Sequence, residues 1–134
     1  MDLRVVSGAC HCGKVAFEAA VDMASARRCN CSICRMRGAV GVSAALADFK
    51  VTRGEEALTL YTFNTHEAKH YFCSACGIYT HHQRRSDPTQ YCVNVACIEA
   101  LSPFDFAVVE VLEGVRHPND GGGGRAGVLR FERG

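Results

Sequence analysis

The residues in this sequence best suited to chemistry are three groups of cysteines. They are Cys10-His11-Cys12, Cys29-Asn30-Cys31-Ser32-Ile33-Cys34 and Cys73-Ser74-Ala75-Cys76-Gly77. A Cys-x-x-Cys turn lets two thiolates converge on one metal ion, and Gly77 permits the positive φ that closes such a turn. Two cysteine pairs that are distant in the sequence would supply the four thiolates of a closed, tetrahedral zinc site.

A single Cys-x-x-Cys motif could equally be a redox pair or a chance occurrence. The sequence lacks the βαβ pattern of thioredoxin-like proteins, which weakens the redox interpretation. Three groups that together contain seven of the nine cysteines, in a chain of 134 residues, favour metal binding.

Seven cysteines are more than one structural zinc ion requires. Four would fill one site and leave three, and three protein ligands with an open fourth position are typical of catalytic zinc. Alternatively, Cys92, Cys97 or a histidine completes the second site. Spacing alone leaves both alternatives open and does not say which groups share an ion.

Composition and charge narrow the class of protein. A chain of 134 residues with 48% hydrophobic and 22% charged residues predicts one globular domain. No apolar run is long enough to span a membrane, and the start of the chain lacks the pattern of a signal peptide. We therefore expect a cytoplasmic protein whose cysteines stay reduced. The net charge of +1 argues against nucleic acid as a partner.

Short strands are expected to position the cysteines. Alternating and β-branched patterns predict strands at residues 15–19, 58–63, 69–72, 78–81, 90–95 and 106–112. Residues 64–67 are a plausible hairpin connection, and residues 43–48 form either a short helix or a strand that ends in a turn. Residues 119–127 are rich in glycine and predict a flexible segment. The sequence therefore predicts a single, mainly β domain over residues 1–134.

The cysteine motifs with their neighbours resemble the glutathione-dependent formaldehyde-activating enzyme family, which includes the C-terminal domain of a vertebrate centromere protein. The matching segments run from Ser7 to Val15, from Cys29 to Arg35 and from Phe72 to Gly77. Residues 47–55 and 93–97 also match, and Gly114 with His117-Pro118 resembles the closing motif of the family. The four glycines at 121–124 depart from the usual tail.

The resemblance implies a pairing of the ligands. Cys10, Cys12, Cys73 and Cys76 would hold a structural zinc ion, and Cys29, Cys31 and Cys34 would hold a second, catalytic zinc ion with an open position. The implied fold is a β-tent, similar to that of a small zinc-binding Rab exchange factor.

The resemblance also implies an activity. Glutathione, or a similar thiol, would condense with formaldehyde or a related aldehyde to give an S-hydroxyalkyl adduct, formally a carbon–sulfur lyase reaction in reverse. Zinc would either lower the pKa of the thiol or polarise the aldehyde oxygen. The alternative function is a non-enzymatic, zinc-stabilised module that binds a protein.

Four arginines bracket the three-cysteine loop: Arg27, Arg28, Arg35 and Arg37. Arginine forms bidentate pairs with carboxylates, so these residues are candidates for binding glutathione, with Arg35 first among them. They would otherwise offset thiolate charge or lie in solvent. Asn94 either orients a ligand or pairs with the backbone.

The histidines and the remaining cysteines carry weaker predictions. The side chain of His11 is expected to point away from the metal. His81 and His82 lie on an alternating strand, so one of them should face inward, either as an acid–base group or as a core residue. Cys92 and Cys97 are expected to be small, buried apolar side chains.

Overall fold

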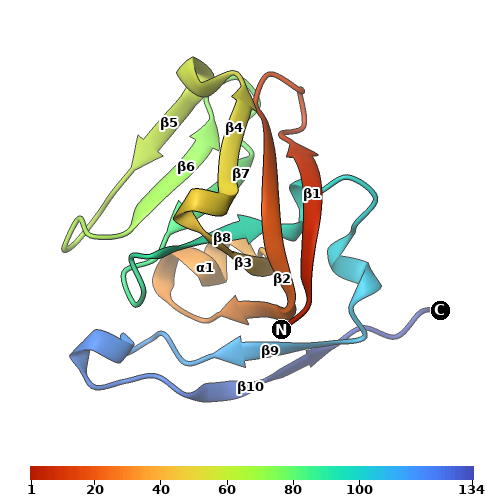
Figure 1. Ribbon diagram of the computed structural model, residues 1–134. Coiled ribbons are helices and arrows are strands. Elements are labelled where there is room, and N and C mark those ends of the chain that lie inside the picture. The colour runs from red at the N-terminus through yellow and green to blue at the C-terminus, as the bar shows by residue number, and fades with distance from the viewer.

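Ten β-strands and one short α-helix make up the computed structural model, which describes residues 1–134 (Figure 1). The strands are β1 (Leu3–Ala9), β2 (Ala16–Cys29), β3 (Gly41–Ala45), β4 (Phe49–Arg53), β5 (Leu58–Tyr61), β6 (Lys69–Cys73), β7 (Tyr79–Gln83), β8 (Gln90–Asn94), β9 (Val108–Leu112) and β10 (Arg125–Arg130), and the helix is α1 (Ser32–Arg37). All strands belong to one sheet in the order β10-β9-β2-β3-β8-β7-β6-β5, and β1 and β4 also pair with β2. The prediction of a single, mainly β domain is confirmed.

Strand β2 is the centre of the sheet because its two halves have different partners. Its first half pairs with β1 and β4, and its last residues pair with β3 and, in parallel, with β9. The register shifts between Asp22 and Arg27, where the hydroxyl of Ser25 donates to the carbonyl of Asp22 and accepts from the amide of Ser43. The long strand therefore carries core residues first and site residues last.

Side chains alternate between buried and exposed positions along the strands, and the buried ones form the core. In the first half of β2, Phe17, Ala19 and Val21 are buried while Glu18 is exposed, as expected for a strand with one face inside. The main core adds buried side chains from the neighbouring strands and from the segments that adjoin them: Val40, Val42, Ala44, Val93, Val95, Cys97, Ile98 and Val109. A second, smaller cluster contains Cys10, Val15 and Cys73.

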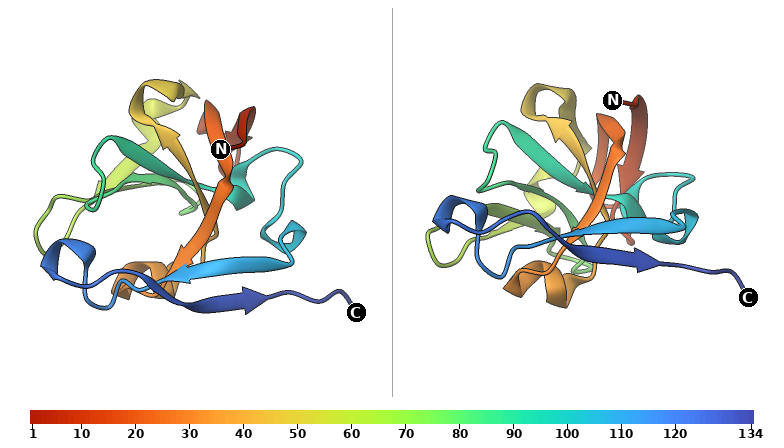
Figure 2. Two further views of the ribbon diagram at one scale, coloured as in Figure 1. Left: turned by 60° about the horizontal axis from the view of Figure 1, so that its bottom comes forward. Right: turned by 90° about the horizontal axis from the view of Figure 1, so that it is seen from below.

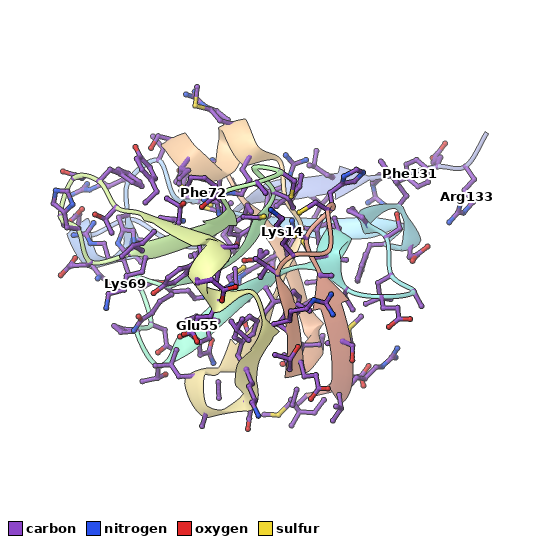
Figure 3. All side chains as sticks on the ribbon, turned by 90° about the horizontal axis from the view of Figure 1, so that it is seen from above. Lys14, Glu55, Lys69, Phe72, Phe131 and Arg133 are labelled. Carbon is purple, nitrogen blue, oxygen red and sulfur yellow. The ribbon has the colours of Figure 1, made fainter.

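The C-terminal strands lie at the edge of this arrangement. Strands β9 and β10 run side by side along the bottom of Figure 1, and the chain after β10 extends away from the body in Figure 2. Phe131 and Arg133 lie on this tail (Figure 3). No helix of the structure has the length and apolar character needed to cross a membrane.

The six predicted strands are all present with shifted ends, and the hairpin at residues 64–67 joins β5 to β6 as expected. Of the two alternatives for residues 43–48, the structure has the strand that ends in a turn: β3 ends at Ala45, and a short 3-10 helix follows at Leu46–Asp48. The flexibility of residues 119–127 stays a prediction. The end of this segment forms the start of β10, which begins at Arg125 and pairs with β9. Its backbone groups thus gain partners that the glycine-rich composition does not reveal.

Candidate metal centres and their pocket

Four cysteine thiols converge from two connections of the sheet. Cys10 and Cys12 lie between β1 and β2, and Cys73 and Cys76 lie at the connection of β6 with β7. Their sulfur atoms all lie within 4.8 Å of one another, with Cys10–Cys12 at 3.6 Å and Cys12–Cys73 at 3.7 Å. A disulfide needs about 2.0 Å, whereas a tetrahedron of sulfurs about 2.3 Å from a zinc ion has edges of about 3.8 Å. The separations fit a metal site and exclude disulfides.

The backbone holds these thiols in two similar turns. Gly13 and Gly77 close the turns with φ values of 79° and 77°, which confirms the expectation for Gly77. The amide of Gly13 donates to the carbonyl of Cys10 at 3.1 Å, and the amide of Gly77 donates to the carbonyl of Cys73 at 2.8 Å. Cys10 and Cys73 are buried, Cys76 is partly buried and Cys12 is exposed, so the cluster is closed on its inner side and reaches the surface at Cys12.

The second cluster is formed by three cysteines where β2 meets α1. Cys29 ends β2, Cys31 is the N-cap residue of α1, and Cys34 lies within the helix. Their sulfur atoms also lie within 4.8 Å of one another. The amide of Cys31 donates to the sulfur of Cys29 at 3.4 Å.

The crowding of these thiols favours a bound cation. The pKa of Cys31 is lowered to about 2, mainly by its contact with the Cys29 thiol and to a lesser extent by its contact with the Cys34 thiol. The pKa of Cys29 is raised by Cys31, and the pKa of Cys34 is raised by Cys29 and then by Cys31. Alone, the cluster therefore favours a single thiolate. A divalent cation removes this restriction because it stabilises all three thiolates.

The chain after β9 closes one side of the three-cysteine cluster. The side-chain oxygen of Asn30 accepts from the amides of Gly114 at 2.7 Å and Val115 at 3.2 Å. The side-chain amide of Asn30 donates to Glu113 at 3.2 Å. A Cβ on Gly114 would overlap the sulfur of Cys29, so only glycine fits there. Asn30 thus has a positioning role that its place between two cysteines does not reveal.

The three-cysteine cluster lies in the wall of a cavity of about 490 Å³. This volume is within the range of pockets that bind small molecules. The cavity wall is rich in arginine, from Arg27, Arg28, Arg35, Arg37, Arg84 and Arg85, against only two acidic side chains, Glu113 and Asp120. The pocket is therefore cationic, although the whole chain has a net charge of only +1.

Arg37 is held against a set of rings in this wall. It donates to Nδ1 of His70 at 2.8 Å and contacts Nδ1 of His82 at 3.5 Å, and its guanidinium carbon lies 3.6 Å from the centre of the Tyr79 ring. Because a guanidinium only donates hydrogen bonds, it favours neutral imidazoles that accept at Nδ1. Burial acts in the same direction, lowering the pKa of His70 to about 4 and that of His82 to about 3.

The four arginines singled out in the sequence all line the pocket. Arg35 is exposed at its rim, whereas Arg27, Arg28 and Arg37 are partly buried. Asn94 is buried and does not line the pocket. Its amide donates to the carbonyl of Tyr79 at 2.8 Å and its oxygen accepts from the amide of Ala96 at 3.1 Å, so it pairs with backbone.

The histidines divide as the alternating strand predicts. His81 faces the core and stacks on Tyr71, while His82 lines the pocket. Cys97 is buried, but Cys92 is only partly buried and lines the pocket, which differs from the expectation for that residue. His70 and Arg84 stand outside every motif of the sequence, yet they reach the pocket from β6 and from the end of β7.

Fold and site together define a mainly β protein with two cysteine clusters suited to metal ions. Residues 5–109 match the model of the family described as glutathione-dependent formaldehyde-activating enzyme, so the chain belongs to this family. A crystal structure of a Rhodobacter sphaeroides protein is similar, with 56% sequence identity and a TM-score of 0.73. The match covers 74% of this chain and 93% of that one.

Proposed function

We propose that the protein binds one zinc ion in each cluster and condenses glutathione, or a similar thiol, with formaldehyde at Cys29, Cys31 and Cys34. The observation that carries the proposal is the difference between the two clusters. The four-cysteine cluster has the complete ligand set of a structural site, whereas the other offers three thiols in the wall of a cavity. Three protein ligands leave a coordination position for a substrate.

The chemistry of the donor set fits zinc, which prefers thiolate ligands in tetrahedral sites. Held by three thiolates, the ion would act as a Lewis acid, either toward the thiol or toward the aldehyde oxygen. In the reaction a carbon–sulfur bond forms, and the thiol proton ends on the former carbonyl oxygen.

The chain itself supplies the surroundings of this step. The arginines of the pocket stabilise negative charge as it develops on the aldehyde oxygen, because fixed cationic donors need no reorganisation during the reaction. The neutral side chains of His70 and His82 leave the charge of Arg37 uncompensated. Asn30 fixes the segment at Gly114 against the cluster.

Metal analysis and exchange NMR test the proposal together. We expect about two zinc ions per chain and faster exchange in a mixture of glutathione and formaldehyde than the spontaneous rate. Cys31→Ser should lose the second ion and the acceleration. Cys92→Ser is the matched control, because Cys92 lines the same pocket outside the cluster. No acceleration by zinc-loaded protein would exclude this substrate pair and favour a non-enzymatic zinc module.

A further inference from the structure

The arginines of the pocket lack carboxylate partners. The ion pairs of the structure involve only Arg4, Arg85 and Arg133. The remaining five pocket arginines, Arg27, Arg28, Arg35, Arg37 and Arg84, thus have no carboxylate within 4.0 Å. Such a concentration of one charge in a cavity attracts an anionic ligand.

Two of these arginines converge on one oxygen. A terminal nitrogen of Arg27 donates to Oγ of Ser43 at 3.2 Å, and a terminal nitrogen of Arg84 donates to the same atom at 3.1 Å. Ser43 is buried on β3, so it holds both guanidinium groups in fixed positions. The two like charges repel each other, and a carboxylate bound between them would remove this repulsion.

One nitrogen atom of the Arg84 side chain also lacks a hydrogen-bond partner. This atom is Nε, which is buried. The charge of Arg84 lowers the pKa of Asp87 from a distance, but Asp87 makes no ion pair with Arg84, and one of its carboxylate oxygens accepts from the amide and the hydroxyl of Thr89. The charge of Arg84 is therefore not neutralised by any carboxylate of the chain, and its Nε–H has no acceptor.

The geometry of β2 places Arg27, and with it Arg84, near the three-cysteine cluster. Arg27 and Cys29 are two residues apart on β2, and such residues point to the same face with a spacing of about 7 Å. Both residues line the cavity. A ligand whose sulfur lies at the three-cysteine cluster would thus reach Arg27 and Arg84 with a group several bonds from its sulfur.

We infer that Arg27 and Arg84, positioned by Ser43, form a carboxylate-binding subsite that makes the pocket selective for acidic peptide thiols over neutral thiols. This inference rests on the proposed function, since the thiol end of the ligand is placed at Cys29, Cys31 and Cys34. Glutathione has the required chemistry because its carboxylates lie several bonds from its sulfur.

Binding of S-methylglutathione to the zinc-loaded protein tests the subsite without thiol chemistry. Calorimetry should show tighter binding of this probe than of its diethyl ester, which lacks both carboxylates. Arg27→Gln and Arg84→Gln should each weaken binding about tenfold or more, because a charge-assisted hydrogen bond is lost. The matched control is Arg130→Gln, which removes the same charge from an exposed position on β10 and should bind like the wild type.

A second measurement avoids dependence on variants that fail to fold. In the wild-type protein, the side-chain Nε–H resonance of Arg84 should shift on titration with S-methylglutathione and not with the ester. Equal binding of acid and ester, wild-type affinity in folded Arg27→Gln and Arg84→Gln proteins, or an unmoved Arg84 resonance would each overturn the subsite. Arg84-dependent binding without any acceleration of exchange would support the subsite and exclude the proposed reaction.

Discussion

Gly114 packs directly against the three-cysteine cluster. Its added Cβ would meet the sulfur of Cys29 and the Cβ of Cys31. We therefore expect Gly114→Ala to lower the zinc content from about two ions per chain to about one, because the displaced thiol no longer completes the site. Metal analysis after desalting measures this change.

Gly127→Ala is the matched control for Gly114→Ala. Gly127 lies on β10, and a Cβ there would meet nothing within 4 Å. This variant should keep both ions. Full zinc content in Gly114→Ala would show that the chain after β9 moves freely and does not shape the site.

Residue roles were predictable where the residue type carries the chemistry. The cysteines stand out by type and spacing, and the structure groups them into one set of four and one set of three. Asn30 and Arg84 did not stand out, because their roles come from contacts with Gly114 and Ser43, which lie 84 and 41 residues away in the chain. For Asn94 the sequence left ligand orientation and backbone pairing open, and in the structure its amide group pairs with the backbone.

Arg85 links two connections of the sheet at the wall of the cavity. Its Nε donates to Glu67 at 2.6 Å, and its terminal nitrogens donate to the two carboxylate oxygens of Asp120 at 3.1 Å and 3.2 Å. Glu67 lies between β5 and β6, and Asp120 lies between β9 and β10. Arg85 therefore fixes both connections with one side chain.

Arg85→Ala should loosen these two connections without unfolding the sheet. We expect faster amide hydrogen exchange in residues 64–68 and 117–122, with little change in the free energy of unfolding, because both acids are largely exposed. Arg133→Ala breaks a comparable ion pair on the tail and should leave both segments unchanged. Unaltered exchange in Arg85→Ala would show that other contacts hold the connections.

Elements were predictable in proportion to the regularity of their own pattern. The strands at 58–63 and 69–72 alternate and flank a turn, so they and their hairpin were found. Strands β1 and β4 were missed for different reasons. In β1 the apolar Leu3 and Val5 are exposed, so its pattern does not follow burial. Strand β4 is only five residues long, although Phe49 and Val51 alternate with exposed polar residues. Both segments are strands because β2 supplies partners for their backbone groups.

The four-cysteine cluster acts on the whole molecule because it joins distant parts of the sheet. Cys12 and Cys73 are 61 residues apart, and the second hydrophobic cluster packs around Cys10 and Cys73. A metal ion bound by these four cysteines would cross-link that packing. We expect Cys12→Ser to lower the Tm by ~10 °C or more, because binding to a structural site contributes directly to folding.

Cys31→Ser is the natural comparison because it removes one thiol from the other cluster. That cluster is formed by residues close together in the chain, so its loss should change the Tm by only ~2–4 °C. Thermal denaturation of both variants, with zinc content measured on the same samples, separates the two roles. Equal losses of Tm would show that the three-cysteine cluster is also structural.

Stability of the whole molecule should depend on pH through its buried histidines. His81 packs against Phe49, Tyr71 and Tyr91, and burial lowers its pKa to about 4. An unfolded chain has a histidine pKa of about 6.5. Between these two values the unfolded state binds a proton that the folded state does not, so the free energy of unfolding falls as pH decreases through this window.

His81→Gln isolates this effect, because glutamine does not titrate. Urea denaturation at several pH values from about 4.5 to about 7 should give a shallower pH dependence for His81→Gln than for the wild type. The difference in slope should approach ~1.4 kcal/mol per pH unit, the value for one proton. If the proposed zinc ions dissociate in acid, the effect is common to both proteins and cancels in the comparison. His66→Gln removes an exposed imidazole and should follow the wild type. Parallel curves for His81→Gln and the wild type would contradict the prediction. They would mean that His81 binds a proton as readily in the folded protein as in the unfolded chain, so that burial does not lower its pKa.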